Sequence, residues 1–203
     1  MKNILKLLFG IGLLLGSFQA KAEFNVLDAF NDSNTNTTAA TVFIPEGQGV
    51  AKLTDVSVQQ DVEGTYIAVY PGARTIIVTT GAAAASTNFV CQGMDTNNFA
   101  TGDYLIFKTA TGYQLRNVQA FDATNLYTTA SATKSQTNGA KIWWVGGRQE
   151  RWGGYFVDGQ ATTNSIARTT EVYFKSGFPV GIVATNASAG TTKAYISGIR
   201  IGK

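Results

Sequence analysis

Short runs with strand character recur about every ten to fifteen residues along this chain of 203 residues, and turns containing glycine separate them. Within several runs, apolar and polar residues alternate, so that apolar side chains fall on one face of a strand. No window carries a sustained apolar period of 3.6 residues, which argues against a helical core. We therefore predict strands at residues 56–58, 66–70, 75–80, 104–108, 114–121, 141–145, 155–157, 171–175, 181–184 and 194–201.

Regular short strands joined by glycine-rich turns are typical of sandwiches and small barrels. We predict an all-β fold with a β-sandwich or jelly-roll-like layer in residues 42–203. The strand runs between residues 89 and 147 follow one another closely and indicate a small β-barrel or meander subdomain. The flanking residues 42–80 and 153–203 are then expected to pair into the second sheet layer.

The first 22 residues differ from the rest of the chain in charge and hydropathy. Lys2 and Lys6 precede or border an uncharged stretch at residues 7–18, and Ala20 to Ala22 has the small-residue pattern of a cleavage site. As a helix, that stretch would span about 18 Å, less than the roughly 30 Å hydrocarbon core of a bilayer. We predict an N-terminal hydrophobic helix in residues 1–22 that acts as a signal peptide, with a retained membrane anchor as the alternative. The protein is accordingly expected to be exported to the periplasm, the extracellular space or a particle surface.

Residues 23–41 are predicted to form an extended N-terminal arm. The segment is rich in Asn, Thr, Asp and Ser, and its charge density is too low for a disordered tail. Its apolar side chains would anchor the arm on the body of the protein, and they are Phe24, Val26, Leu27 and Phe30.

Charge is distributed unevenly along the chain. The formal net charge of +3 comes from Lys2, Lys6 and Lys21, so 13 basic and 13 acidic residues remain after residue 22. Residues 23–103 hold nine acidic and two basic side chains, a net of −7, whereas residues 104–203 hold four acidic and eleven basic ones, a net of +7. If the halves form distinct surfaces, the dipole suits head-to-tail contact between copies. If their strands interleave in one sandwich, the charges mix. A neutral body also lacks the basic groove that nucleic acid requires.

The residue inventory excludes several kinds of catalytic and metal site. The chain has no histidine, so it cannot build a Ser-His or Cys-His pair or an imidazole metal site. Its single cysteine, Cys91, cannot form an intrachain disulfide, and the apolar run around it predicts a buried, inert thiol. Nothing in the spacing of the carboxylates pairs them for glycoside hydrolysis, the candidates being Glu150, Asp158 and Glu171. We predict a protein that is not an enzyme and needs no cofactor.

One polar run begins like a calcium-binding loop. Asp32, Asn34 and Asn36 match the first three ligand positions of that loop. The loop also requires Gly at its sixth position and Glu at its twelfth, where this chain has Thr37 and Phe43. We therefore predict a polar loop here and no metal site.

All three tryptophans of the chain lie within ten residues, together with two arginines. Because side chains alternate along a strand, Trp143 and Trp144 are expected to point to opposite faces. Three interpretations stay open for this cluster: an inter-sheet core with arginines lying over aromatic faces, a contact between subunits, or a site where an indole stacks on a sugar or nucleotide. The candidate ligand or assembly contacts are Trp143, Trp144, Arg148, Arg151, Trp152 and Tyr155.

These features together favour a non-enzymatic structural protein. We expect a minor capsid, decoration or coat subunit of an extracellular or virion surface assembly. Four features agree with this expectation: export or membrane targeting, missing catalytic chemistry, a β-rich sequence of small polar residues, and opposed charge in the two halves. Its partners would be copies of itself or neighbouring structural subunits, with membrane contact only through residues 1–22. The alternative is a secreted carbohydrate-binding β-sandwich module that binds glycan through exposed Trp residues.

Cleavage after Ala22 would make Glu23 the first residue of the exported protein. Mass spectrometry of the N-terminal peptide of protein purified from a secreting host is expected to show a chain that begins at Glu23. The substitution Ala22→Leu should block cleavage, because the residue before the cut must be small. A wild-type chain that keeps Met1 would contradict the signal peptide and favour the membrane anchor.

Overall fold

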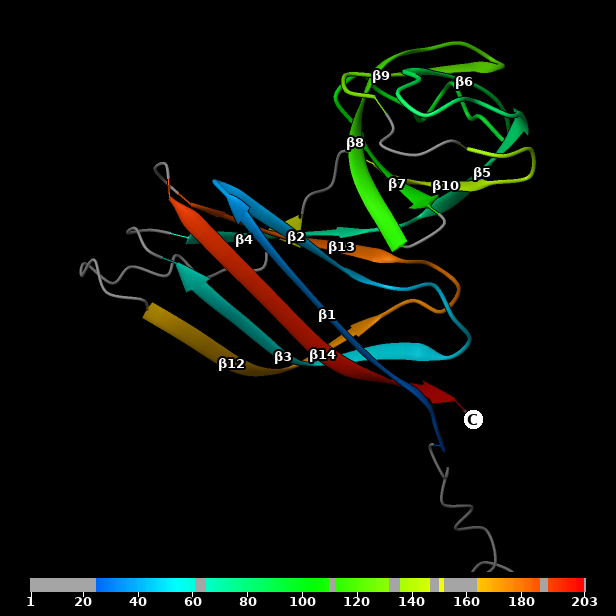
Figure 1. Cartoon of the computed structure of the whole chain (residues 1–203). Coiled ribbons are helices and arrows are strands. Elements are labelled where there is room, and N and C mark those ends of the chain that lie inside the picture. The colour runs from blue at the N-terminus through cyan, green and yellow to red at the C-terminus, as the bar shows by residue number, and fades with distance from the viewer. Residues whose placement is uncertain are drawn as a thin grey trace, which may run out of the picture.

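The computed structural model describes residues 25–60, 65–109, 112–131, 136–146, 150–151, 164–186 and 190–202, and its regular elements in these ranges are all β-strands. They form two four-stranded sheets and a closed six-stranded barrel beside them (Figure 1). The predicted all-β fold, with a sandwich layer and a small barrel, is confirmed. The helix predicted in residues 1–22 and the strand predicted at 155–157 lie outside the described residues. Within the described part of the chain, no helix has the length and apolar character needed to cross a bilayer.

The first sheet, sheet A, brings the two ends of the described chain side by side. Its strand order is β1-β14-β3-β12, and every neighbouring pair is antiparallel. The described part of the predicted arm is therefore integrated into the sandwich, since β1 pairs with β14 from Asn25 opposite Gly202 to Thr37 opposite Thr191. The strands of sheet A are β1 (Asn25–Thr37), β3 (Val50–Gln60), β12 (Asn164–Phe174) and β14 (Thr191–Gly202).

The strand order of sheet A also decides how the two charged halves of the chain are arranged. β1 and β3 come from the acidic half, whereas β12 and β14 come from the basic half, and the two kinds of strand alternate across the sheet. The halves therefore interleave, and sheet A is not one pole of a dipole. Of the two arrangements left open by the sequence, the structure has the mixed one.

The second sheet, sheet B, has the order β11-β4-β13-β2. The chain passes from β1 in sheet A to β2 in sheet B at Thr38, which has a φ of 75° and donates its N–H to the carbonyl oxygen of Gly190 at 2.8 Å. A β-branched residue with positive φ is uncommon, and here it makes the corner between the sheets. The strands of sheet B are β2 (Ala39–Ile44), β4 (Thr65–Pro71), β11 (Glu150–Arg151) and β13 (Val180–Asn186).

The core of the sandwich follows from side-chain alternation on both sheets. In β2, Ala40, Val42 and Ile44 are fully buried and face sheet A, while Thr41 and Phe43 between them face the other way. This pattern places one apolar face of each sheet against the other. The core consists of Phe30, Ala40, Val42, Ile44, Ala51, Leu53, Val56, Val58, Ile67, Val69, Val180, Ile182, Ala184, Ala194 and Ile196.

The barrel closes in the order β10-β5-β6-β9-β8-β7 around its own apolar core, which contains Phe89, Leu105 and Phe107. Closure leaves the barrel with no unpaired strand edge. It starts at Arg74, so β5 belongs to it and not to the flanking sheet layer that the sequence predicted for residues 42–80. Its strands are β5 (Arg74–Thr80), β6 (Asn88–Gln92), β7 (Tyr104–Thr109), β8 (Gly112–Phe121), β9 (Asn125–Thr128) and β10 (Lys141–Gly146).

A third apolar cluster, which we call the junction, joins the barrel to the outer face of sheet B. From the barrel, Ile106 and Trp143 point away from the barrel core and are at most 1% exposed. From sheet B, Tyr70 of β4 meets them, and its ring lies 4.4 Å from that of Tyr104. The partly buried members of the junction are Phe43, Ala68, Tyr104, Tyr113, Leu115, Phe178 and Val183.

The sandwich is packed closely around Gly198 of β14. A Cβ atom at this position would collide with the backbone oxygen of Lys52 and the ring of Phe30. We expect Gly198→Ala to lower the free energy of unfolding by about 1–3 kcal/mol, the usual cost of overpacking a core. Urea denaturation of the purified protein measures this change.

Gly181 of β13 provides the matched control for this prediction. It also lies within a strand, but its added Cβ would approach only side-chain atoms, the nearest being Cε1 of Phe43 at 3.3 Å. Because a side chain can shift more easily than backbone, Gly181→Ala should cost clearly less. Equal losses at the two positions would contradict the close packing described at Gly198.

Candidate functional site

The two described tryptophans of the aromatic cluster lie in different cores. Trp143 is 1% exposed in the junction, where its ring centroid lies 5.9 Å from that of Tyr113. Trp144 points into the barrel, stacks on Phe99 at 5.1 Å and donates its indole N–H to Asp103 Oδ2 at 2.7 Å. The adjacent rings therefore point to opposite faces of β10, as the alternation predicts. Trp143 has no exposed face on which a sugar could stack.

Of the other members of the predicted cluster, the structure describes only the backbone of Arg151. Arg151 lies in β11, where its backbone pairs with that of Ala68. Arg148, Trp152 and Tyr155 lie outside the described residues. The described residues point instead to two surfaces, the outer face of sheet A and a polar groove that includes the calcium-like run Asp32 to Asn36.

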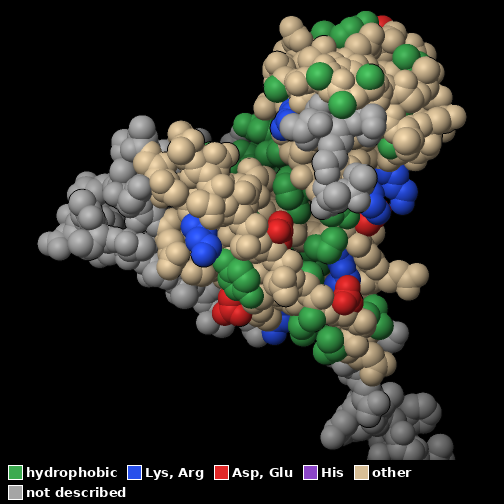
Figure 2. All heavy atoms as spheres, viewed as in Figure 1, with side chains coloured by type: hydrophobic (Ala, Val, Ile, Leu, Met, Phe, Trp, Pro, Cys, Tyr) green, Lys and Arg blue, Asp and Glu red, His purple; other side chains and the backbone are tan. Residues whose placement is uncertain are grey.

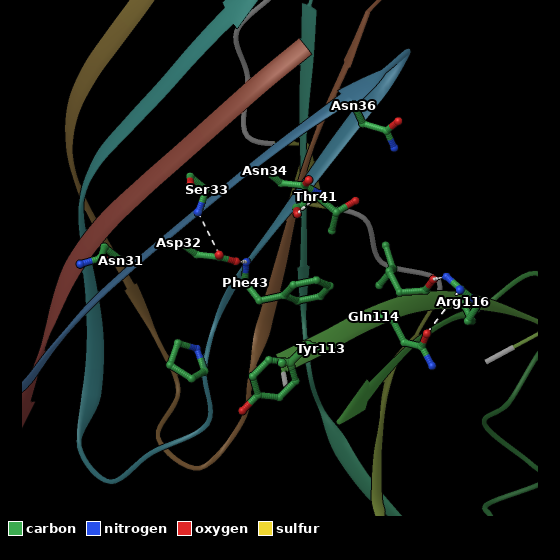
Figure 3. A pocket seen from close by; sticks show the side chains of 13 residues that line it. Asn31, Asp32, Ser33, Asn34, Asn36, Thr41, Phe43, Tyr113, Gln114 and Arg116 are labelled. Atoms are coloured by element: carbon green, nitrogen blue, oxygen red, sulfur yellow. Dashed lines mark hydrogen bonds between the residues drawn. The ribbon is translucent and has the colours of Figure 1, made fainter. Parts of the chain in front are cut away.

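The groove, which has a volume of about 640 Å³, lies where the rim of the barrel meets the sandwich. β1 and β2 form one side, and β8 forms the other (Figure 3). Figure 3 shows Asn34 and Asn36 on the side of β1 that faces the ring of Phe43, whereas Asn31 points the opposite way. The residues that line it are Asn31, Asp32, Ser33, Asn34, Asn36, Thr41, Phe43, Pro45, Gly112, Tyr113, Gln114, Leu115 and Arg116.

The run that resembles a calcium loop forms part of this groove and is a strand, which corrects the prediction of a polar loop. Both carboxylate oxygens of Asp32 accept backbone N–H groups, from Ser33 at 2.8 Å and from Phe43 at 2.7 Å. Asn34 Nδ2 donates to the carbonyl oxygen of Thr41 at 2.9 Å. These side chains tie the edge strand of sheet A to the edge strand of sheet B, so they close this side of the sandwich.

A loop after β2 fastens the sandwich to the barrel next to the groove. Glu46 Oε1 pairs with Lys108 Nζ at 2.5 Å and its Oε2 with Lys141 Nζ at 3.4 Å, and both lysines belong to the barrel. The Glu46 N–H also donates to the Tyr113 hydroxyl at 3.0 Å. Burial by itself raises the pKa of the Glu46 carboxyl, but the two ammonium groups together outweigh burial and hold the pKa below its ordinary value of 4.5.

A buried arginine holds the backbone of the same loop at Pro45 and Gly47. Arg200 of β14 is 2% exposed, and its guanidinium donates to the carbonyl oxygens of Pro45 and Gly47. Its charged group also lies over the ring of Phe30, at 5.9 Å from the centroid. A buried cation needs such partners, because an uncompensated charge in a core is costly. Arg200 therefore holds the loop that presents Glu46 to the barrel.

The outer face of sheet A is open, in contrast to the outer face of sheet B, against which the barrel packs at Phe43, Tyr70 and Val183. Register places Val26, Ile201 and Val50 side by side across three strands, and Tyr173 beside Lys52. Figure 2 shows hydrophobic side chains gathered near the end of β14, with charged side chains of both signs distributed over the same face. Among the described residues, large hydrophobic side chains are exposed at Val26, Leu27, Val50, Val90, Tyr173 and Tyr195, and all except Val90 lie on sheet A.

The groups capable of catalysis or metal binding are dispersed within the described ranges. Burial of Cys91 in the barrel core raises its thiol pKa to about 12, so the reactive thiolate is scarce at neutral pH. In the part of the chain that the structure describes, no group of three or more carboxylate or thiol side chains gathers to hold a metal ion.

The sequence matches no protein-family model and no curated protein. Among solved structures, it is similar to VP17, a capsid protein of bacteriophage P23-77, at 13% identity over 90% of this chain and 100% of that chain, with a TM-score of 0.20. A chain of the VP16–VP17 complex, formed by the two major capsid proteins of that phage, is 11% identical over 89% of this chain and 96% of its own, with a TM-score of 0.16. The VP2 subviral particle of infectious bursal disease virus is 11% identical over 88% of this chain and 40% of that chain, with a TM-score of 0.11. At TM-scores this low, the similarity does not assign a function to this chain.

The lowered pKa of Glu46 predicts a pH-dependent attachment of the barrel. A carboxyl whose pKa is lower in the folded state contributes stability above its unfolded pKa and loses it as pH falls through the folded pKa. The free energy of unfolding of the wild type should therefore fall below about pH 4.5 more steeply than that of Glu46→Gln, by about 1 kcal/mol or less because the lysines are half exposed.

Urea denaturation between neutral pH and pH 3 measures the difference between the two proteins. Lys108→Met removes one of the two ammonium groups, so the free energy of unfolding of this variant should also depend less on pH than that of the wild type. Adding Lys108→Met to Glu46→Gln should cause no further loss of pH dependence. Parallel pH curves for the wild type and Glu46→Gln would contradict the role of this ion pair.

Proposed function

We propose that this chain is a non-enzymatic structural protein of a particle or extracellular surface assembly, and that it acts by contact with further copies of itself. One observation carries the proposal: the barrel packs against the outer face of sheet B at Phe43, Tyr70 and Val183, whereas the outer face of sheet A is open and exposes tyrosine and valine side chains. Aromatic and aliphatic side chains on an open sheet face are suited to the centre of a protein–protein contact.

The size of the open face supports a contact that is repeated within an assembly. Four strands about 4.8 Å apart and about nine residues long at 3.4 Å each give a face of about 600 Å². Two copies that meet over it would bury about 1,200 Å² in total, at the lower end for specific interfaces. Such a contact is weak for an isolated pair, and it becomes effective when each subunit makes several contacts.

The charges on this face are compatible with contact between identical surfaces. Lys52 and Lys193 lie on it together with Asp55, whose carboxylate accepts a hydrogen bond from Ser197 Oγ at 3.0 Å. Both signs are therefore present at neighbouring positions, so a second copy can place a lysine near an aspartate. A face with a single sign of charge would repel its own copy.

A matched pair of valines tests the proposal. Val50 on sheet A and Val90 on the barrel are 40% and 37% exposed, and both lie in strands. We expect weak self-association of the wild type between about 10 µM and about 1 mM, and Val50→Asp should weaken it about tenfold, the effect of roughly 1.4 kcal/mol at an interface. Sedimentation velocity measures the association.

Val90→Asp is the control, because it makes the same change in charge and strand propensity outside the proposed contact. It should leave the association constant unchanged, and circular dichroism should show both variants folded. A wild type that stays monomeric over the whole concentration range would overturn the proposal, as would equal effects of the two substitutions.

A further inference from the structure

We propose that the groove between β1, β2 and β8 binds a neutral carbohydrate, most simply a short oligosaccharide. The groove is not lined by Trp143 or Trp144 of the cluster that the sequence suggested for glycan binding, although the Trp143 ring lies next to Tyr113, with the ring centroids 5.9 Å apart. Its volume of about 640 Å³ falls within the roughly 300–1,000 Å³ of small-molecule sites. This function is separate from the contact proposed for sheet A, which uses the outer face of that sheet.

Two aromatic rings provide the apolar surface of the groove. The ring centroids of Phe43 and Tyr113 lie 5.7 Å apart with a tilt of 34°, one ring from the sandwich and the other from the barrel (Figure 3). A pyranose has an apolar face of C–H groups, which matches an aromatic surface, and a rim of hydroxyl groups, which requires polar partners. Ligand sites commonly combine such apolar area with a few placed polar groups.

The polar partners are neutral side chains on the β1 and β2 side. Asn34, Asn36 and Thr41 line the groove, and amides and hydroxyls can both donate and accept hydrogen bonds. A sugar hydroxyl also does both, so this set of side chains is complementary to it. The bond from Asn34 to the Thr41 backbone fixes the orientation of one amide before a ligand arrives, which lowers the entropy cost of binding.

The charged groups of the groove are already engaged within the protein, which argues against an ionic ligand. Both oxygens of Asp32 accept backbone N–H groups. Arg116 donates to the carbonyl oxygens of Ser131 at 2.9 Å and Leu115 at 2.7 Å, and to Gln114 Oε1 at 3.3 Å. An incoming phosphate or carboxylate would therefore find three of the five Arg116 N–H donors already in use, whereas a neutral sugar needs no charged partner.

Titration of the isotopically labelled protein with maltotriose, cellotriose and tri-N-acetylchitotriose tests the proposal by NMR. At least one trisaccharide should cause saturable shifts of the Asn34 and Asn36 side-chain amide signals and of the Thr41 backbone signal. Phe43→Leu, which keeps an apolar side chain but removes the aromatic face, should weaken binding about tenfold or more. Asn36→Ala should weaken it several-fold.

Two substitutions outside the groove serve as controls. Phe121 is a partly buried aromatic residue of the barrel, and Asn97 is an exposed amide in a barrel loop, so Phe121→Leu and Asn97→Ala should leave the affinity unchanged. Equal losses in these controls, or no saturable shift with any of the three trisaccharides, would overturn the proposal. Shifts of the same signals with protein concentration and without sugar would also overturn it if they persist in Val50→Asp, because a second copy of the chain would then fill the groove and not meet the outer face of sheet A.

Discussion

The arrangement of this protein depends on one constraint, which is that sheet B is apolar on both faces. Its inner face packs on sheet A, and its outer face carries Phe43, Tyr70 and Val183. Left open, that face would be an association hazard. The barrel covers it with Trp143, and truncation of a buried aromatic side chain costs about 3–5 kcal/mol out of a typical total stability of about 5–15 kcal/mol. Barrel and sandwich are therefore coupled energetically as well as by the chain.

Both proposed functions follow from where the barrel sits. Because it covers sheet B, the outer face of sheet A is the remaining broad sheet surface, and it is the one that carries Tyr173 and Tyr195. Because β8 of the barrel packs beside β2 through the rings of Tyr113 and Phe43, it stands opposite β1 and β2, and a groove forms between them. Glu46 and Arg200 hold the loop beside this groove, so its two sides are fixed relative to each other.

The sequence predicts those parts of the fold that depend on local alternation. The strand runs, the small barrel and the opposite directions of Trp143 and Trp144 all follow from a period of two residues. β1 was expected to be an arm because an edge strand needs few apolar residues, and Phe30 is its one buried side chain. The alternation of Asp32 and Asn34 was a usable strand signal, but their partners Thr41 and Phe43 belong to the other sheet. Pairings between strands that are far apart in the sequence, such as that of β5 with β10, also decide where the barrel begins and how the charged halves mix.

The path of the chain into and out of the barrel allows the barrel to evolve separately from the sandwich. The chain leaves sheet B after β4 and comes back through β10, and these two passages touch, since the Ala73 N–H donates to the Trp144 carbonyl oxygen at 2.8 Å. The barrel is a closed unit that is connected to the sandwich through two adjacent strands, β5 and β10. It can therefore be exchanged for another unit without a change in the path of the chain through the sandwich. Mutations that reshape its distal loops leave the junction intact, so one sandwich scaffold can present different outer surfaces in related proteins.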